Sequence, residues 1–182
     1  DSVISFNYDL VFEQSLGKTR RWGYRCVTET TKLLSIYKPH GSINWELVSG
    51  RVVSRKKAPA RPVVVAPTHL KFIGKGENDP TRIFGYLDTA EQLSRIWTEM
   101  EKELKLAKAI VFIGYSFPSA DLYFSSLLRT VFSGRGATPK IVLVNPNSAE
   151  IAAKLRSKFG VVCKSYFDLV QFNNIPRRTM FG

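Results

Sequence analysis

Three segments of this chain share one pattern, and that pattern constrains the fold more than any other feature. Each begins with an apolar run, continues through a short polar turn and ends with the apolar spacing of an amphipathic helix; they are residues 3–16, 109–132 and 140–159. Ile110–Ile113 and Ile141–Val144 are apolar at consecutive positions, which is typical of parallel strands covered on both faces. The pattern predicts an α/β fold with a Rossmann-like, open and mostly parallel sheet that has helices on both faces.

The chain between the first two segments has a different character. Leu33–Tyr37 predicts a further strand. Trp45–Val48 and Arg51–Ser54 flank Ser49-Gly50, and this arrangement predicts a β-hairpin with a two-residue turn. We therefore expect one domain over residues 1–182, with a small hairpin insertion at 44–66.

A long helix is predicted from Thr89 to Ala107, with one apolar stripe that belongs to the core. The stripe consists of Leu93, Trp97, Met100 and Leu104. Thr89 with Gln92, and Asn147 with Glu150, have the three-residue spacing of capping pairs at helix starts.

Composition limits the classes of function. The 182 residues suffice for one packed core, and no window is long and apolar enough to span a membrane, so a cytoplasmic protein is expected. Cys26 and Cys163 are the only cysteines, and we expect neither a disulfide framework nor a bound metal. The net charge of +12 suits a polyanionic partner, either a nucleic acid or a dinucleotide, although scattered basic residues are also typical of a solvated surface.

Few residues with useful chemistry follow the predicted strands. They are Asn7, Asp9, His40, Gly114, Ser116 and Asn145. Each also has a structural interpretation: Asn7, Asp9 and Ser116 are common helix caps, Gly114 suits close packing, and a lone histidine is often part of the core. Pro39 and Gly41 beside His40 favour a fixed, irregular backbone that would hold the ring in place.

In succession, several motifs resemble the sirtuin-like (Sir2-type) NAD-binding and NAD-hydrolase domain family of bacteria. These motifs are FNYD, KPHGSINW, VAPTHLK, AIVFIGYSFPSAD and VNPNS, and the resemblance covers residues 3–150. It implies a Rossmann-like domain that binds NAD+. Many members, often in antiviral defence systems, hydrolyse NAD+ to nicotinamide and ADP-ribose, whereas true sirtuins use NAD+ to deacylate lysines.

The same resemblance implies a role for each residue. Asn7 would position the ribose and the attacking water, Asp9 would contact the nicotinamide carboxamide, and His40 would act as general base at the ribose hydroxyls. Gly114 and Ser116 would line the phosphate and ribose region, and Asn145 would lie near the adenosine ribose. A histidine can take a hydroxyl proton at neutral pH, so the chemistry agrees with these roles.

The chain departs from the family pattern in two ways. No Gly-rich phosphate loop precedes NYD, which leads us to expect the C-terminal part of a domain truncated at its amino end, with weak or no hydrolase activity by itself. The four-cysteine zinc module of true sirtuins is also missing, which disfavours a deacylase.

We therefore expect an enzyme of the NAD+ glycohydrolase type. The alternative is a non-catalytic sirtuin-like module that binds a nucleotide or nucleic acid. NAD+ is the expected partner, with no membrane contact. A homo-oligomer, a nucleic acid and a phage-derived trigger remain open as further partners.

Overall fold

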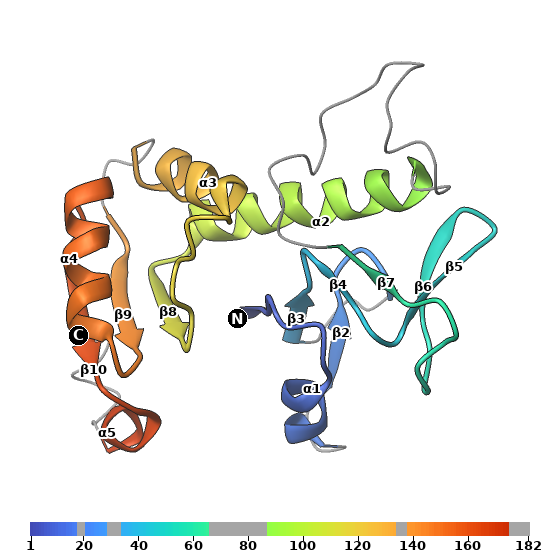
Figure 1. The fold of residues 1–182 in the computed structure, drawn as a ribbon, viewed down its shortest axis with the longest axis horizontal. Helices are drawn as coiled ribbons and strands as arrows, with labels where there is room; N and C mark the ends of the chain where they lie inside the picture. The colour runs from blue at the N-terminus through green and yellow to red at the C-terminus, as the bar shows by residue number, and fades with distance from the viewer. Residues whose placement is uncertain (18–20, 29–33, 66–86, 134–137, 175–182) are drawn as a thin grey trace. The chain divides into compact units, whose positions relative to one another are not determined.

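The computed structural model describes residues 1–17, 21–28, 34–65, 87–133 and 138–174 (Figure 1). The chain divides into two compact units, Asp1–Met100 and Glu101–Gly182, which are described separately below. The boundary falls within α2 (Leu87–Leu106), the longest helix in the described part of the chain. None of the described helices has the length and apolar character needed to cross a membrane.

Unit 1 contains a three-stranded parallel sheet with the order β1-β3-β2. Its strands are β1 (Ser2–Ile4), β2 (Trp22–Tyr24) and β3 (Leu34–Tyr37), and α1 (Val11–Leu16) follows β1. Ile4 pairs with Tyr37, and the amide of Ser5 continues the ladder by donating to the Tyr37 carbonyl. The predicted strands at β1 and β3 are confirmed; β2 was not predicted.

Two short antiparallel pairs complete the described strands of unit 1. β4 (Gly41–Ser42) pairs with β7 (Val63–Val64), and β5 (Trp45–Val48) pairs with β6 (Arg51–Ser54). The predicted strands Trp45–Val48 and Arg51–Ser54, joined by the Ser49-Gly50 turn, are confirmed. Both turn residues have positive φ, 49° at Ser49 and 75° at Gly50, as a type I′ turn requires.

Unit 2 contains a second parallel sheet with the order β10-β9-β8. Its elements are β8 (Ala109–Ile113), α3 (Leu122–Ser133), β9 (Lys140–Val144), α4 (Ser148–Phe159), β10 (Cys163–Tyr166) and α5 (Leu169–Asn173). Figure 1 shows α4 alongside β9 and β10, which it contacts. Together with the parallel sheet of unit 1, these strands and helices confirm the Rossmann-like α/β class, with the parallel strands divided between two sheets.

The two apolar runs of unit 2 differ in how deeply they are buried. All four residues of Ile141–Val144 are buried, as expected for the central strand of the sheet. In β8, Ile110 and Phe112 are buried whereas Ile113 is 54% exposed. The expectation that both faces are covered therefore holds for β9 and is wrong for the end of β8.

The predicted helix stripe is confirmed, but both predicted capping pairs are wrong. Leu93, Trp97, Met100 and Leu104 of α2 are all buried. The helix begins at Leu87, before Thr89, and the Gln92 side chain accepts a hydrogen bond from the Val52 amide instead of capping the helix. At α4, the Asn147 side chain makes no capping bond, and Glu150 pairs with Lys154.

A close approach between two strands requires glycine at position 41. Its φ is +84°, and a Cβ at this position would overlap the carbonyl oxygen of Val63. Because the obstacle is backbone of the paired strand β7, a side chain at residue 41 would have to push β4 and β7 apart.

We predict that Gly41→Ala lowers the free energy of unfolding of unit 1 by more than about 2 kcal/mol, since left-handed strain of about 1–2 kcal/mol adds to this clash. The measurement is urea unfolding followed by tryptophan fluorescence, because Trp22, Trp45 and Trp97 all lie in unit 1. Gly17→Ala is the matched control, because Gly17 has φ +59° and a Cβ added there would meet nothing within 4 Å. Equal effects of the two changes would contradict the clash.

Candidate functional site

The turn between β1 and α1 exposes the side chains of Asn7 and Asp9. Asp9 Oδ1 accepts a hydrogen bond from the Val11 amide at 3.0 Å and so satisfies a free donor at the start of α1. The Asn7 side chain makes no hydrogen bond to another described residue. The capping interpretation therefore applies to Asp9 and not to Asn7.

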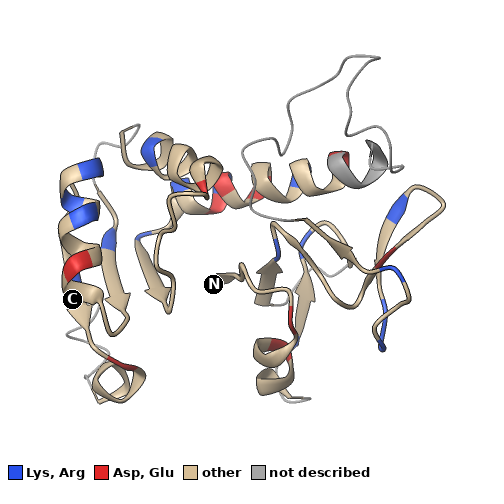
Figure 2. Cartoon of the chain, in the orientation of Figure 1, with Lys and Arg blue, Asp and Glu red and all other residues tan. Residues whose placement is uncertain are grey.

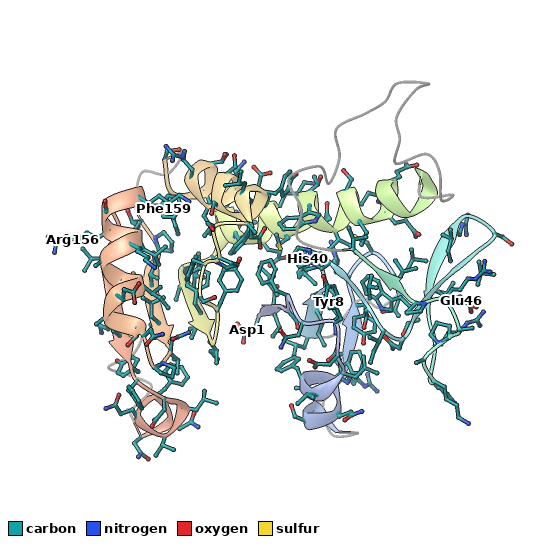
Figure 3. The ribbon with its side chains drawn as sticks, viewed as in Figure 1. Asp1, Tyr8, His40, Glu46, Arg156 and Phe159 are labelled. Carbon is teal, nitrogen blue, oxygen red and sulfur yellow. The ribbon has the colours of Figure 1, made fainter. Side chains whose placement is uncertain are left out.

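His40 lies in an aromatic enclosure and is only 2% exposed. Its ring centroid is 5.4 Å from that of Phe6, 6.3 Å from Tyr8 and 5.8 Å from Trp97. The Trp97 indole also donates to the Pro39 carbonyl at 3.1 Å, which ties α2 to the loop that carries the histidine. Figure 3 shows Tyr8 and His40 in the same part of unit 1. Because Phe6 and Tyr8 flank Asn7 in the chain, the structure brings the Asn7–Asp9 turn to His40.

A buried ion pair adjoins this turn. Lys38 Nζ lies 2.8 Å from Glu13 Oε1, and the two side chains are 0% and 4% exposed. The Tyr24 hydroxyl donates to the same Glu13 oxygen at 3.0 Å. Burial, reinforced by the Glu13 charge, raises the pKa of Tyr24 well above its ordinary value.

Sequence reasoning missed Lys38, Glu13 and Tyr24. One signal was available: Glu13 lies three residues after Leu10 and three before Leu16, on the helix face where apolar residues were expected. A carboxylate on an inward face requires a partner, and Lys38 at the end of β3 supplies it.

In unit 2, Gly114 and Asn145 follow neighbouring parallel strands at the same edge of the sheet. The Gly114 amide donates to the Val144 carbonyl at 2.9 Å, which places the two turns side by side. A Cβ at Gly114 would meet nothing within 4 Å, and its φ is +67°. The glycine therefore serves backbone conformation, and its interpretation as a close-packing residue is wrong.

The capping groups of unit 2 also differ from expectation. Ser116 is exposed, and the start of α3 is instead capped by buried Asp121, whose Oδ1 accepts from the Phe124 amide at 3.4 Å. The other Asp121 oxygen accepts from the Tyr115 hydroxyl at 2.7 Å, and burial together with this bond raises the pKa of Tyr115. Asn145 Oδ1 accepts from the Asn147 amide at 2.9 Å.

The candidate residues thus form one group in each unit: Asn7, Asp9 and His40 in unit 1, and Gly114, Ser116 and Asn145 in unit 2. A separate polar crevice of about 300 Å³ lies in unit 1, and none of the candidate residues lines it. Its lining consists of Gly23, Arg25, Cys26, Thr28, Ser35, Arg95 and Glu99. Most of the VAPTHLK motif lies outside the described residues.

Metal-ligating side chains do not gather within the described residues. Among them, no group of three His, Cys, Asp or Glu residues has the geometry to hold a metal ion. Lys and Arg residues are spread over both units, with a group on α4 (Figure 2).

Comparison with known proteins gives one positive finding. The family model described as "SIR2-like domain" matches residues 1–163, a span that includes every candidate residue above. A search of curated proteins finds no match.

The buried Tyr24 hydroxyl predicts a specific pH response. Its pKa is raised in the folded state, so the stability that this group contributes is present below the ordinary tyrosine pKa of 10.0 and is lost as the pH rises above it. We expect Tyr24→Phe to unfold at lower urea concentration than the wild type at about pH 8, because the bond to Glu13 is lost. Between about pH 8 and about pH 11, the variant should lose less stability than the wild type.

The measurement is urea unfolding of both proteins at each pH, followed by tryptophan fluorescence. Equal losses of stability in the two proteins over that pH range would show that the Tyr24 hydroxyl does not resist ionisation.

Proposed function

Because the chain belongs to the SIR2-like domain family, whose members bind NAD, we propose that it is an NAD+ glycohydrolase. The reaction breaks the bond between nicotinamide and ribose, consumes one water and yields nicotinamide, ADP-ribose and one proton. The observation that carries the proposal is the packing of His40 against Phe6 and Tyr8, which sets an imidazole beside the turn of Asn7 and Asp9.

Each of these three groups has a distinct part in the proposed reaction. His40 takes a proton from a ribose hydroxyl as positive charge develops on the ribose ring. Its enclosure keeps bulk water away from the imidazole, so that a hydroxyl reaching it meets little competition from solvent. The exposed amide of Asn7 has both a donor and an acceptor and can orient a water or a hydroxyl. Asp9 keeps one carboxylate oxygen beyond its bond to the Val11 amide for the nicotinamide carboxamide.

Within unit 2, Gly114, Ser116 and Asn145 are proposed to contact a phosphate or a ribose. Gly114 and Asn145 lie at the carboxyl ends of parallel strands, where α/β sheets bind ligands. The open space at Gly114 leaves room for a phosphate or ribose beside it, and exposed Ser116 adds a hydroxyl nearby in the chain. A role in antiviral defence, with a phage-derived trigger and a homo-oligomeric state, belongs to this proposal as well.

One observation favours a second function, a non-catalytic module that binds a nucleotide or nucleic acid. The net charge is +12, and Lys154, Arg156 and Lys158 are all exposed on α4. Some cations are paired, since Lys154 lies 2.7 Å from Glu150, Arg55 lies 2.7 Å from Glu46 and Arg25 lies 3.0 Å from Glu99. Binding that weakens steeply with salt, without release of nicotinamide, is the outcome that would favour this module.

For the hydrolase, we predict that His40→Ala, Asn7→Ala and Asn7→Ser in the full-length protein each reduce nicotinamide release at least about a hundredfold, the usual scale for a positioned catalytic group. Melting temperatures of the two Asn7 variants should change little, because the Asn7 side chain is exposed and bonds to no described residue. The measurement is nicotinamide release beside a thermal melt of each protein.

The matched control is Asn173→Ala, which removes an exposed asparagine at the end of α5 and should leave turnover unchanged. Near-normal turnover in Asn7→Ser would return Asn7 to a purely structural role. Retained binding of NAD+ without turnover in the wild type would support the non-catalytic module instead.

A further inference from the structure

The segment that carries His40 also holds the backbone of the Asn7–Asp9 turn. The Tyr8 carbonyl accepts hydrogen bonds from the Ile43 amide at 3.0 Å and from Ser42 Oγ at 3.3 Å. The Asp9 carbonyl accepts a hydrogen bond from Lys38 Nζ. The carbonyls of Tyr8 and Asp9 are therefore bonded to residues 38–43, on either side of the histidine.

The Lys38 ammonium is fixed at its other end by Glu13. This carboxylate lies on α1, immediately after the turn, and it also accepts from the Tyr24 hydroxyl. Tyr24 extends the network to Asn44, whose Oδ1 accepts from Ser42 Oγ at 2.8 Å. A fully buried ammonium with two oxygen partners has little freedom, so the distance between the end of β3 and the Asp9 carbonyl is closely set.

These bonds determine which groups of the turn are available. The rings of Phe6 and Tyr8 pack on His40, and the carbonyls of Tyr8 and Asp9 are bonded to residues 38–43. Asn7 and Asp9 are the exposed residues of the turn, and each carries a polar side chain. Their orientation depends on a backbone that Lys38 holds.

We propose that Lys38 is a positioning residue for Asn7 and Asp9, with Glu13 as its counter-charge. The inference rests on the proposed NAD+ hydrolysis and adds a residue that does not touch the substrate. Loss of the Lys38 bond frees the Asp9 carbonyl and lets the turn shift relative to His40. Misplacement of reacting groups by about 1 Å costs roughly a hundredfold in rate.

The test separates this role from plain stability with a single and a double variant of the full-length protein. Lys38→Met leaves the Glu13 carboxylate buried without its counter-charge and should unfold at lower urea concentration than the wild type. Lys38→Met combined with Glu13→Leu removes both charges and should recover most of that stability. Its kcat for nicotinamide release should nevertheless stay about a hundredfold low, because nothing holds the Asp9 carbonyl. Its KM should remain within about threefold of the wild type.

Glu46→Gln is the matched control, because it breaks an ion pair of unit 1 that lies at the surface, with Arg55 at 2.7 Å. It should change neither kcat nor the urea midpoint. Recovery of wild-type kcat in the double variant, together with its stability, would show that the pair is only structural and would overturn the proposal.

A second measurement does not depend on turnover. The Ile43 amide donates to the Tyr8 carbonyl, so its hydrogen exchange reports whether the turn stays docked. We expect exchange at Ile43 to accelerate in Lys38→Met and in the double variant but not in Glu46→Gln. Unchanged exchange in the double variant overturns the positioning role. Absence of nicotinamide release from the wild type overturns the hydrolase proposal, and the exchange rates then still decide whether Lys38 holds the turn.

Discussion

The parallel pairing of β1 with β3 is the constraint on which the candidate site of unit 1 depends. Parallel neighbours end at the same edge of a sheet, so the chain leaving Ile4 and the chain leaving Tyr37 emerge side by side. The Ser5 amide donates to the Tyr37 carbonyl, so the two strands stay paired up to the residues where the turns begin. An antiparallel pairing of strands this short would have separated the turns by about 10 Å.

The buried charges of unit 1 contribute more to geometry than to stability. Two charges removed from water lose about as much hydration energy as their attraction returns. A pair of apolar side chains of similar volume would fill the same space between α1 and β3, but it could not bond to a backbone carbonyl. An ammonium adds a directed hydrogen bond, and here that bond holds the backbone carbonyl of Asp9 in the turn. Apolar packing alone would leave this carbonyl unfixed.

Sequence patterns predicted the elements that have a clear local signal in consecutive residues. Ile141–Val144 is apolar throughout and forms the central strand, and the Ser49-Gly50 turn was identified because few residue pairs accept positive φ at both positions. The strand Cys163–Tyr166 was missed because a strand at the edge of the described sheet needs little apolar surface, and its two central residues are exposed. Trp22–Tyr24 was missed because three residues with a central glycine carry no periodicity.

The candidate site was likewise predicted only where the signal is local in the sequence. Motifs identified the positions of Asn7, Asp9 and His40, but which of them caps a helix depends on local backbone geometry: Asp9 bonds to the Val11 amide, and Asn7 does not. The contact between Lys38 and Glu13 joins residues far apart in the chain. A single sequence shows that each charge is present, but it does not show that both are buried against each other.

The two ends of the β5–β6 hairpin are held differently. Hydrogen bonds from Asn44 join the strands at the base, and these bonds do not extend to the tip. Asn44 fixes the base, because its carbonyl accepts from the Arg55 amide at 2.7 Å and its side-chain amide donates to Ser54 Oγ and to the Arg55 carbonyl. Toward the tip at Ser49 and Gly50, the two strands are joined by their own pairing, which ends at Val48 and Arg51. The tip is therefore a suitable place to attach a fluorophore, a purification tag or a longer loop without disturbing the histidine loop at the other end.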